Sequence, residues 1–170
     1  SITNWLPFYW RGFEQTTRYT YRIKDMPIEE LEKALGNDIR RRRKKCLEAG
    51  VEVYESDDLK QFYSLNEMTF KRQGLNTPYT FGFIENLYNK CKENNSVKIY
   101  FAKDKNGVNI AANFLVYDEN TVYNLMSGID TERKDLGGMD LVLFESIKFA
   151  LDKGCIFDFE GSMIESIETY

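Results

Sequence analysis

The sequence predicts an α/β (α+β) fold, with a mixed and mostly antiparallel sheet flanked by helices. Two observations lead to this prediction. Residues 97–129 contain three segments with the two-residue period of β-strands, separated by two short turn sequences. Helical patterns stand before and after this meander, and a strand pattern returns at residues 155–160. With 170 residues, the chain is long enough to bury a core and fits one domain, or one domain with an appendage.

The first third of the chain predicts a strand, a helix and a second strand. Residues 13–24 are rich in β-branched and aromatic types, which favours a strand. Apolar residues recur at helical spacing over residues 28–49, before a glycine ends the pattern. Because Gly36 and Asn37 weaken the middle of this segment, two shorter helices are an alternative. A short strand is expected at residues 51–56.

Helices are expected on both sides of the meander. Asp57 and Asp58 can cap a helix that runs to about residue 72, and a second helix is expected over residues 80–93. The strongest helical pattern opens at paired glycines and covers residues 137–153. A strand over residues 155–160 follows, and then the start of another helix. The three strands of the meander are expected at residues 97–102, 108–117 and 121–129.

The composition excludes several classes of function. The net charge is −4, from 23 Lys and Arg against 27 Asp and Glu, so DNA is not expected as a partner, although a local basic patch remains open. The sequence contains no histidine, which excludes histidine general bases, Ser-His-Asp and Cys-His systems and His-ligated zinc within this chain. No apolar run approaches the roughly 20 residues of a membrane span.

The cysteines point to a reducing compartment. Cys46, Cys91 and Cys155 are an odd number, lie far apart and form no CxxC motif. Neither a disulfide framework nor a cysteine metal site is therefore expected. We accordingly expect a cytoplasmic protein without a bound metal.

The order of elements and several local sequences resemble GNAT-type acyltransferases. The stretches KIYFAKDKNGVNIAANFLVYDENTVYNLMSGID, GMDLVLFESIKFALDKG and CIFDFEGSM are similar to the second GNAT-like domain of FemAB-type proteins. In that family two GNAT-like domains lie in one chain, and LPFYWRGFEQTTRYTYRI resembles the segment that joins them. The resemblance implies a GNAT-like domain over residues 28–170 with a truncated C-terminus. Residues 1–27 would then be an inter-domain segment that follows an absent sister domain.

The resemblance also implies an activity. FemAB relatives include transferases that move amino acids from aminoacyl-tRNA to peptidoglycan precursors, and others are similar to N-acetyltransferases that use acetyl-CoA. The implied function is transfer of an acyl or aminoacyl group to an amine acceptor, with a cell-wall precursor as one candidate. Acetyl-CoA or another acyl-CoA, or an aminoacyl-tRNA, would be the donor. The alternative is a non-catalytic GNAT-like domain that supports a sister domain or binds a ligand.

The resemblance further implies where the donor binds. In GNAT-like folds the strand over residues 121–130 splays away from the strand over residues 155–160, and the acyl donor enters this split. Main-chain groups near Leu125, Met126 and Ser127 would be exposed there and would pair with the donor or hold the acyl oxygen. Ser127 could donate a hydrogen bond to a developing oxyanion. An ordinary structural hydroxyl is the alternative for Ser127.

A glycine-containing loop is the candidate phosphate site. GNAT enzymes hold the CoA pyrophosphate on N–H groups at a helix N-terminus, after a Q/R-x-x-G-x-G/A loop. The corresponding residues here begin at Arg133 and end at Gly137 and Gly138, so the glycines are adjacent instead of spaced. This departure argues against CoA binding at the loop but is compatible with a tRNA donor that binds elsewhere. Alternatively, the glycines only turn the chain into the helix.

Asp158 and Glu160 are the candidate catalytic carboxylates. A period of two would place both on one face of their strand, about 6–7 Å apart. In a partly buried pair one carboxylate has a raised pKa and can take the proton of an attacking amine. Without histidine, a carboxylate, a water relay or the donor's own phosphate must serve as the base. The structural alternative is that these carboxylates pair with arginines or cap the following helix.

Two further segments are candidates for binding. Trp10, Arg11 and Arg18 lie in an aromatic and basic opening segment that suits a phosphate-bearing or sugar-bearing acceptor. Packing between domains is the alternative for this segment. Residues 40–45 are six consecutive cations that could contact a phosphate or tRNA backbone, or could form a solvated helix surface.

Overall fold

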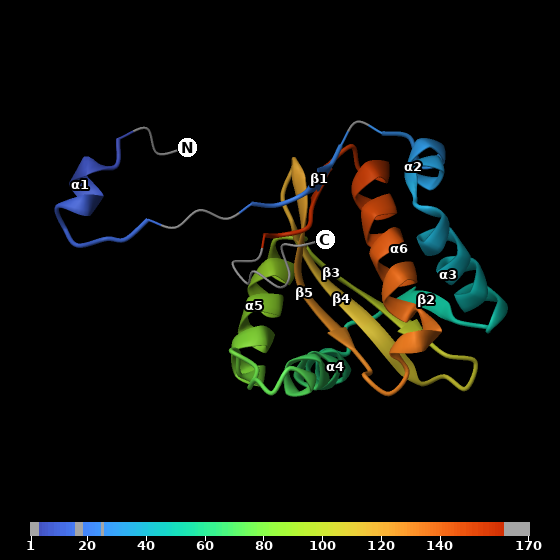
Figure 1. Cartoon of the computed structure of the whole chain (residues 1–170). Helices are drawn as coiled ribbons and strands as arrows, with labels where there is room; N and C mark the ends of the chain where they lie inside the picture. Colours follow the sequence, from blue (N-terminus) through green and yellow to red (C-terminus); the bar gives the residue numbers. More distant parts are fainter. Residues whose placement is uncertain (1–3, 16–18, 25, 162–170) are drawn as a thin grey trace.

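The computed structural model describes residues 4–15, 19–24 and 26–161, which form a six-stranded sheet with helices on both faces (Figure 1). The strand order is β1-β6-β5-β4-β3-β2, and every neighbouring pair is antiparallel except β5 and β6. The predicted mixed, mostly antiparallel sheet is therefore confirmed. The strands are β1 (Arg22–Ile23), β2 (Glu52–Glu55), β3 (Val97–Lys103), β4 (Asn109–Tyr117), β5 (Thr121–Ile129) and β6 (Ile156–Asp158).

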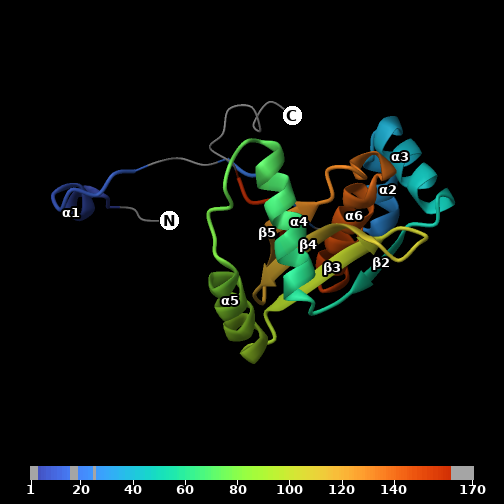
Figure 2. The ribbon, with the colours of Figure 1, turned by 90° about the horizontal axis from the view of Figure 1, so that it is seen from below.

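The helices form two layers around the sheet, as Figures 1 and 2 show from two directions. Helices α4 and α5 cover one face, and α6, with α2 and α3 beside it, covers the other. A short helix, α1, stands apart from the sheet in both views. The helices are α1 (Leu6–Tyr9), α2 (Ile28–Ala34), α3 (Asn37–Glu48), α4 (Leu59–Arg72), α5 (Phe81–Glu93) and α6 (Gly138–Asp152), and a 3₁₀ turn, η1 (Lys134–Leu136), precedes α6.

The helix boundaries have local causes. The segment 28–49 is two helices, because Leu35 and Gly36 both adopt extended ψ angles of 131° and 150° that interrupt the helical hydrogen bonding. Asp58 caps α4 as predicted, since its side chain accepts a hydrogen bond of 3.0 Å from the N–H of Gln61. Thr80 caps α5 in the same way.

The alternation of β4 builds a core on each face of the sheet. Phe114 projects toward α4 and α5, where it packs with Phe62 and Ile84. Leu115 projects to the other face and packs with Phe144 of α6. The neighbouring strand β3 follows the same alternation, with Ile99 and Phe101 toward α4 and α5 and Tyr100 toward α6, so the centre of the sheet is buried on both sides.

The parallel pairing of β5 and β6 is short. β5 and β6 are paired only from Thr121 to Tyr123, after which β5 continues to Ile129 without β6. A register shift against β4 lies just beyond this point and leaves Leu125 of β5 without a partner residue. The chain thus has both the splayed strand pair and a bulge in the strand that lines the gap.

Some predicted elements differ from the structure. The strand expected to reach residue 160 ends at Asp158, because Glu160 has a left-handed φ of 56°. Within the described part of the predicted strand 13–24, Arg22 and Ile23 form β1 and join the sheet through β6, and the Tyr21 carbonyl accepts a hydrogen bond from the Phe159 N–H. The helix expected after residue 161 lies outside the described residues. The domain boundary after residue 27 and the truncated C-terminus stay predictions. Among the described residues, no helix is both long and apolar enough to cross a membrane.

Candidate active site at the splayed strands

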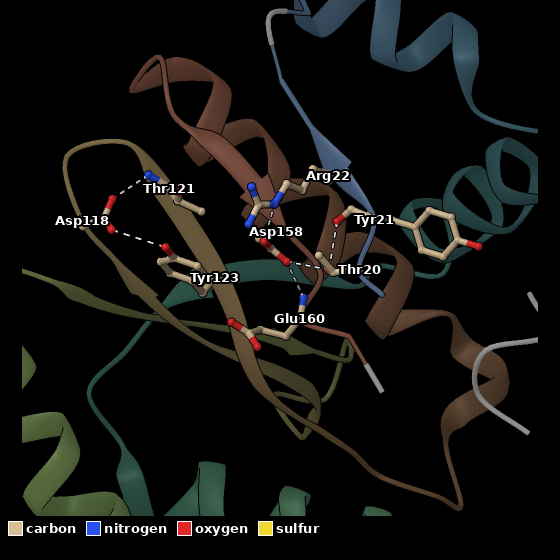
Figure 3. A network of polar contacts seen from close by, with 8 residues as sticks. All are labelled: Thr20, Tyr21, Arg22, Asp118, Thr121, Tyr123, Asp158 and Glu160. Carbon is tan, nitrogen blue, oxygen red and sulfur yellow. Dashed lines mark hydrogen bonds and ion pairs between the residues drawn. The ribbon is translucent and has the colours of Figure 1, made fainter. Parts of the chain in front are cut away.

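Asp158 lies where β5 and β6 separate, and Figure 3 shows the polar network around it. Its carboxylate accepts three hydrogen bonds. Oδ1 accepts from the Thr20 hydroxyl at 2.6 Å and from the Glu160 N–H at 2.9 Å. Oδ2 accepts from Arg22 Nε at 2.7 Å. Asp158 therefore ties the N-terminal strand β1 and the chain after β6 to one buried point.

The electrostatics of Asp158 are those of an ionised structural carboxylate. Burial to 3% exposure would by itself raise the pKa of Asp158. The hydrogen bonds from Thr20, Glu160 and Arg22 outweigh burial and hold this pKa below its ordinary value. The raised pKa expected of a general base is not found here. The pairing with Arg22 instead follows the structural alternative.

Glu160 differs from Asp158 in both backbone conformation and exposure. Its left-handed backbone turns the chain out of the strand, so the two carboxylates do not alternate along one strand face as predicted. Its N–H binds Asp158, while its side chain is exposed (Figure 3). The chain can make this turn because the next residue is Gly161, where an added Cβ would collide with the carbonyl of Tyr19. Glu160 is thus an accessible carboxylate beside the gap.

Helix α4 closes part of the splayed edge of β5. Asn66 Nδ2 donates to the Ser127 carbonyl at 2.7 Å, and the Thr69 hydroxyl accepts from the Ile129 N–H at 3.0 Å. Gly128 allows this approach, because a Cβ there would lie 2.6 Å from the backbone nitrogen of Asn66. The expectation of exposed main-chain groups must be corrected at Ser127, whose carbonyl is already engaged. Leu125, the unpaired bulge residue, has a side chain that is 39% exposed.

Met126 and Ser127 project to opposite faces of the sheet. Met126 is buried in the cluster beneath α4 and α5. Ser127 is opposite Asn113 of β4, which contacts Ser146 of α6, so its side chain belongs to the α6 face. Asp130, just after β5, pairs with Arg133 at 2.6 Å and fixes the start of the loop that leads to α6.

Both glycines of that loop have structural reasons. Gly137 has a left-handed φ of 74°, and a Cβ at Gly138 would lie 2.8 Å from the Ile110 side chain. The first turn of α6 carries Asp140, whose carboxylate pairs with Arg42 Nε of α3 at 2.7 Å. A negative side chain in the first turn competes with a bound anion for the helix N-terminus. The paired glycines thus fit tight packing, and Asp140 disfavours a pyrophosphate directly on this end.

The basic run of residues 40–45 is divided among several surfaces. Arg42 reaches α6, and the Arg43 guanidinium lies 3.3 Å from the centre of the Phe144 ring. Arg41 and Lys44 pair with acidic residues of their own helix. A groove of about 870 Å³ borders this run and the start of α6, and its lining includes Arg41, Arg42, Lys45, Lys134, Gly137 and Asp140. In the described structure, the basic side chains of residues 40–45 therefore do not form a single stripe along α3.

Two of the predicted acceptor residues, Trp10 and Arg11, are not assembled with the splayed strands. Trp10 is 74% exposed and Arg11 is also exposed, in the segment that contains α1. Arg18 lies outside the described residues. The described residues contain no group of three or more acidic or cysteine side chains placed to hold a metal ion.

The sequence analysis missed the partners of the predicted residues. Thr20 and Arg22 share one face of the predicted N-terminal strand, and this pattern is the local signal for a carboxylate opposite them. Asn66 and Thr69 are three residues apart on α4 and so face the same neighbour. No sequence pattern identifies that neighbour as β5.

Comparisons with known proteins agree with this geometry. Residues 33–163 match the family described as acetyltransferase (GNAT) domain. The crystal structure of FemX has a TM-score of 0.77 and 17% identity, over 86% of this chain and 53% of that chain. A conserved protein of unknown function from Bacteroides thetaiotaomicron VPI-5482 has a TM-score of 0.64 and 15% identity, over 92% and 55% of the two chains. L-PGS from Bacillus licheniformis has a TM-score of 0.57 and 13% identity, over 90% and 49%.

These likenesses concern the fold. The identities to the solved structures are below 20%, and the present chain spans about half the length of each of the three. The search of curated proteins finds no match. The family match covers the meander, the splayed strands and α6, which are the elements that build the candidate site.

Proposed function

Because the chain belongs to the acetyltransferase (GNAT) domain family, we propose that it transfers an acyl or aminoacyl group to an amine acceptor at the gap between β5 and β6. The observation that carries this proposal is the separation of the two strands after Tyr123 and Asp158, with an unpaired bulge at Leu125. An extended donor can pair with main-chain groups that such a gap leaves open. The Ser127 carbonyl and the Ile129 N–H are already engaged, so the stretch from Asn124 to Met126 is the proposed contact.

The proposed chemistry needs no covalent enzyme intermediate. The amine nitrogen attacks the activated carbonyl, loses a proton and displaces a thiolate or a ribose hydroxyl as the leaving group. Ser127 is the proposed donor to the carbonyl oxygen during the attack. Glu160 is the proposed proton acceptor, because its carboxylate is exposed beside the gap, whereas the buried Asp158 carboxylate already accepts three hydrogen bonds.

Two donor classes share this chemistry. Acyl-CoA is the donor that the GNAT family match supports. Aminoacyl-tRNA is supported by the adjacent glycines and by Asp140 in the first turn of α6, which disfavour a pyrophosphate at that position. The FemX likeness supports a cell-wall precursor as acceptor and a sister domain in the full protein. Cytoplasmic location is also proposed, since all three cysteines are free thiols.

Thermal unfolding with ligands tests the proposal. Acetyl-CoA or CoA at 100 times its Kd should stabilise the chain by about 2.7 kcal/mol, which raises the Tm by several degrees. ATP is the control, because it supplies a nucleotide and phosphates without the acyl-bearing arm. A shift with acetyl-CoA but not with ATP supports a CoA donor. A shift only with a non-hydrolysable amide analogue of a 3′-aminoacyladenosine supports the aminoacyl donor. The absence of any shift favours a non-catalytic domain.

A further inference from the structure

Two buried amide oxygens lie at the splayed strands without hydrogen-bond partners. Among the described residues, three buried side-chain polar atoms have no partner, and these are Arg43 Nε, Asn113 Oδ1 and Asn124 Oδ1. The two oxygens belong to the neighbouring strands β4 and β5. An unpaired buried acceptor is costly, so folded proteins rarely keep one without a reason.

The register places both oxygens on the α6 face of the sheet. Asn113 is opposite Ser127, and Asn124 is opposite Leu115, which is two residues beyond Asn113 on β4. Residues two apart on a strand project to the same face, about 7 Å from each other. Asn124 directly precedes the bulge at Leu125 and follows the last residue that pairs with β6. The two amides thus flank the bulge, where the proposed donor would enter.

The hydrogen bonds of α6 fix which end of Asn113 is unpaired. The Ser146 hydroxyl donates to the Val142 carbonyl at 2.7 Å, so its oxygen accepts from Asn113 Nδ2 at 3.3 Å. An amide in the opposite orientation would present an acceptor to that hydroxyl, which has no second hydrogen to give. Asn113 is fully buried, and its oxygen is left as an acceptor. The missing partner must therefore be a hydrogen-bond donor.

We propose that Asn124, which is only partly buried, accepts an N–H group of the acyl donor near the reacting carbonyl, whereas the fully buried Asn113 lies behind it. This inference rests on the proposed function. Both candidate donors carry such a group, because the CoA arm contains amide N–H groups and an aminoacyl ester carries an α-ammonium beside its carbonyl. Because α4 already binds the Ser127 carbonyl and the Ile129 N–H, the Asn124 side chain is left to contact the ligand at this part of the edge. Asn124 is a positioning residue for the donor.

The variant Asn124→Leu tests the proposal, because it removes the unpaired acceptor and keeps a similar shape. The expected Kd for the probe that binds, acetyl-CoA or the amide analogue of 3′-aminoacyladenosine, is about tenfold higher, as for the loss of about 1.4 kcal/mol. The expected Tm is equal to or above that of the unaltered chain, since an unsatisfied polar atom has been removed. Binding is measured by calorimetry and the Tm by circular dichroism.

Asn109→Leu is the matched control on the same sheet. Asn109 Oδ1 accepts from the Tyr54 hydroxyl at 2.8 Å, so its replacement should lower the Tm and leave the Kd unchanged. The opposite pattern in the two variants separates a ligand contact from a stability contact. The variant Asn124→Asp separates the two sources of the N–H group, since a carboxylate should tighten binding of an ammonium much more than binding of a neutral CoA amide.

Each remaining outcome overturns the proposal. If Asn124→Leu binds its probe as tightly as the unaltered chain, the Asn124 oxygen holds only water, while the proposed transferase function stands. If Asn124→Leu lowers the Tm as Asn109→Leu does and leaves the Kd unchanged, Asn124 is a structural residue. If the unaltered chain binds neither probe, the donor assignment of the proposed function fails and the present inference fails with it.

Discussion

Asp158 is a residue whose type was predictable and whose role was not. The sequence places two carboxylates near the end of the last strand, but their partners come from residues 20–22, more than 130 positions earlier. Three donors converge on Asp158 and keep it ionised, whereas Glu160 is left exposed. The local pattern therefore identified the site, and the long-range contacts decided which carboxylate is structural.

Asp158→Asn should lower the free energy of unfolding by about 1–3 kcal/mol at pH 7, because an amide cannot accept all three hydrogen bonds. Urea unfolding measures this change. The control replaces Glu93, a carboxylate that forms an exposed ion pair with Lys90. Glu93→Gln should alter stability by less than about 0.5 kcal/mol.

The contribution of Asp158 should depend on pH in one direction. Its pKa in the folded chain lies below the unfolded value of about 3.9, so its stabilisation is present above that pH and is lost as the pH falls through the folded pKa. The stability difference between the unaltered chain and Asp158→Asn should therefore narrow on acidification below about pH 4. Other carboxylates with lowered pKa values, such as Asp104 and Asp118, affect both proteins equally. A difference that stays constant to pH 2.5 contradicts this assignment.

Glu160→Gln tests the proposed proton acceptor. Loss of general-base catalysis typically reduces turnover by about 10²–10⁴-fold, while the exposed side chain should leave the Tm nearly unchanged. Acyl transfer to a candidate amine, measured with the full protein, provides the rate. Glu85→Gln, at an exposed position of α5, is the control and should retain normal turnover. Normal turnover in Glu160→Gln would remove Glu160 from the mechanism.

At the scale of elements, the contact between α4 and β5 decides how much of the splayed edge is open. Gly128 lets the α4 backbone approach β5, and Asn66 and Thr69 then reach its outward main-chain groups. The sequence predicts α4 and β5 separately from their periodicities. The sequence does not indicate that α4 covers part of the β5 edge, because this contact depends on how closely the helix packs on the sheet.

Gly128→Ala should disturb this contact. The new Cβ would lie 2.6 Å from the Asn66 nitrogen and 2.7 Å from the Leu65 carbonyl carbon, so the α4 backbone must move. We expect a loss of about 1–3 kcal/mol in the free energy of unfolding, as for other overpacked sites. Gly82→Ala is the control, since nothing lies within 4 Å of a Cβ there and alanine favours the interior of α5. Equal stabilities for the two variants would contradict the close approach.

At the scale of the whole molecule, the sequence predicted the sheet and its order of elements, because period-two segments and amphipathic helices are local signals. The family was predicted separately, from the resemblance of local sequences, and the family match confirms it. The break between α2 and α3 at Gly36 was a stated alternative, and the structure selects it. The early end of β6 and the place of β1 beside it depend on contacts between the two ends of the described fold.

Truncations should separate the roles of the N-terminal residues. Removal of residues 1–14 should leave the Tm nearly unchanged, because α1 has no buried residue and stands apart from the sheet. Removal of residues 1–24 should lower the Tm by several degrees, because β1 and its hydrogen bonds to Asp158 are lost. Circular dichroism melting curves compare the two. Equal Tm values in both truncations would mean that β1 contributes little to the sheet.

The position of β6 between β1 and β5 also affects when the chain can finish folding. β1 can be seated only after residues 156–158 leave the ribosome, since β6 separates it from the remainder of the sheet. Contacts between residues so far apart in sequence form late, because a long loop must close first. During synthesis, the growing polypeptide would carry Arg22 and Thr20 unattached until nearly the whole domain has emerged. The acyl-entry gap would then be among the last features of the domain to assemble.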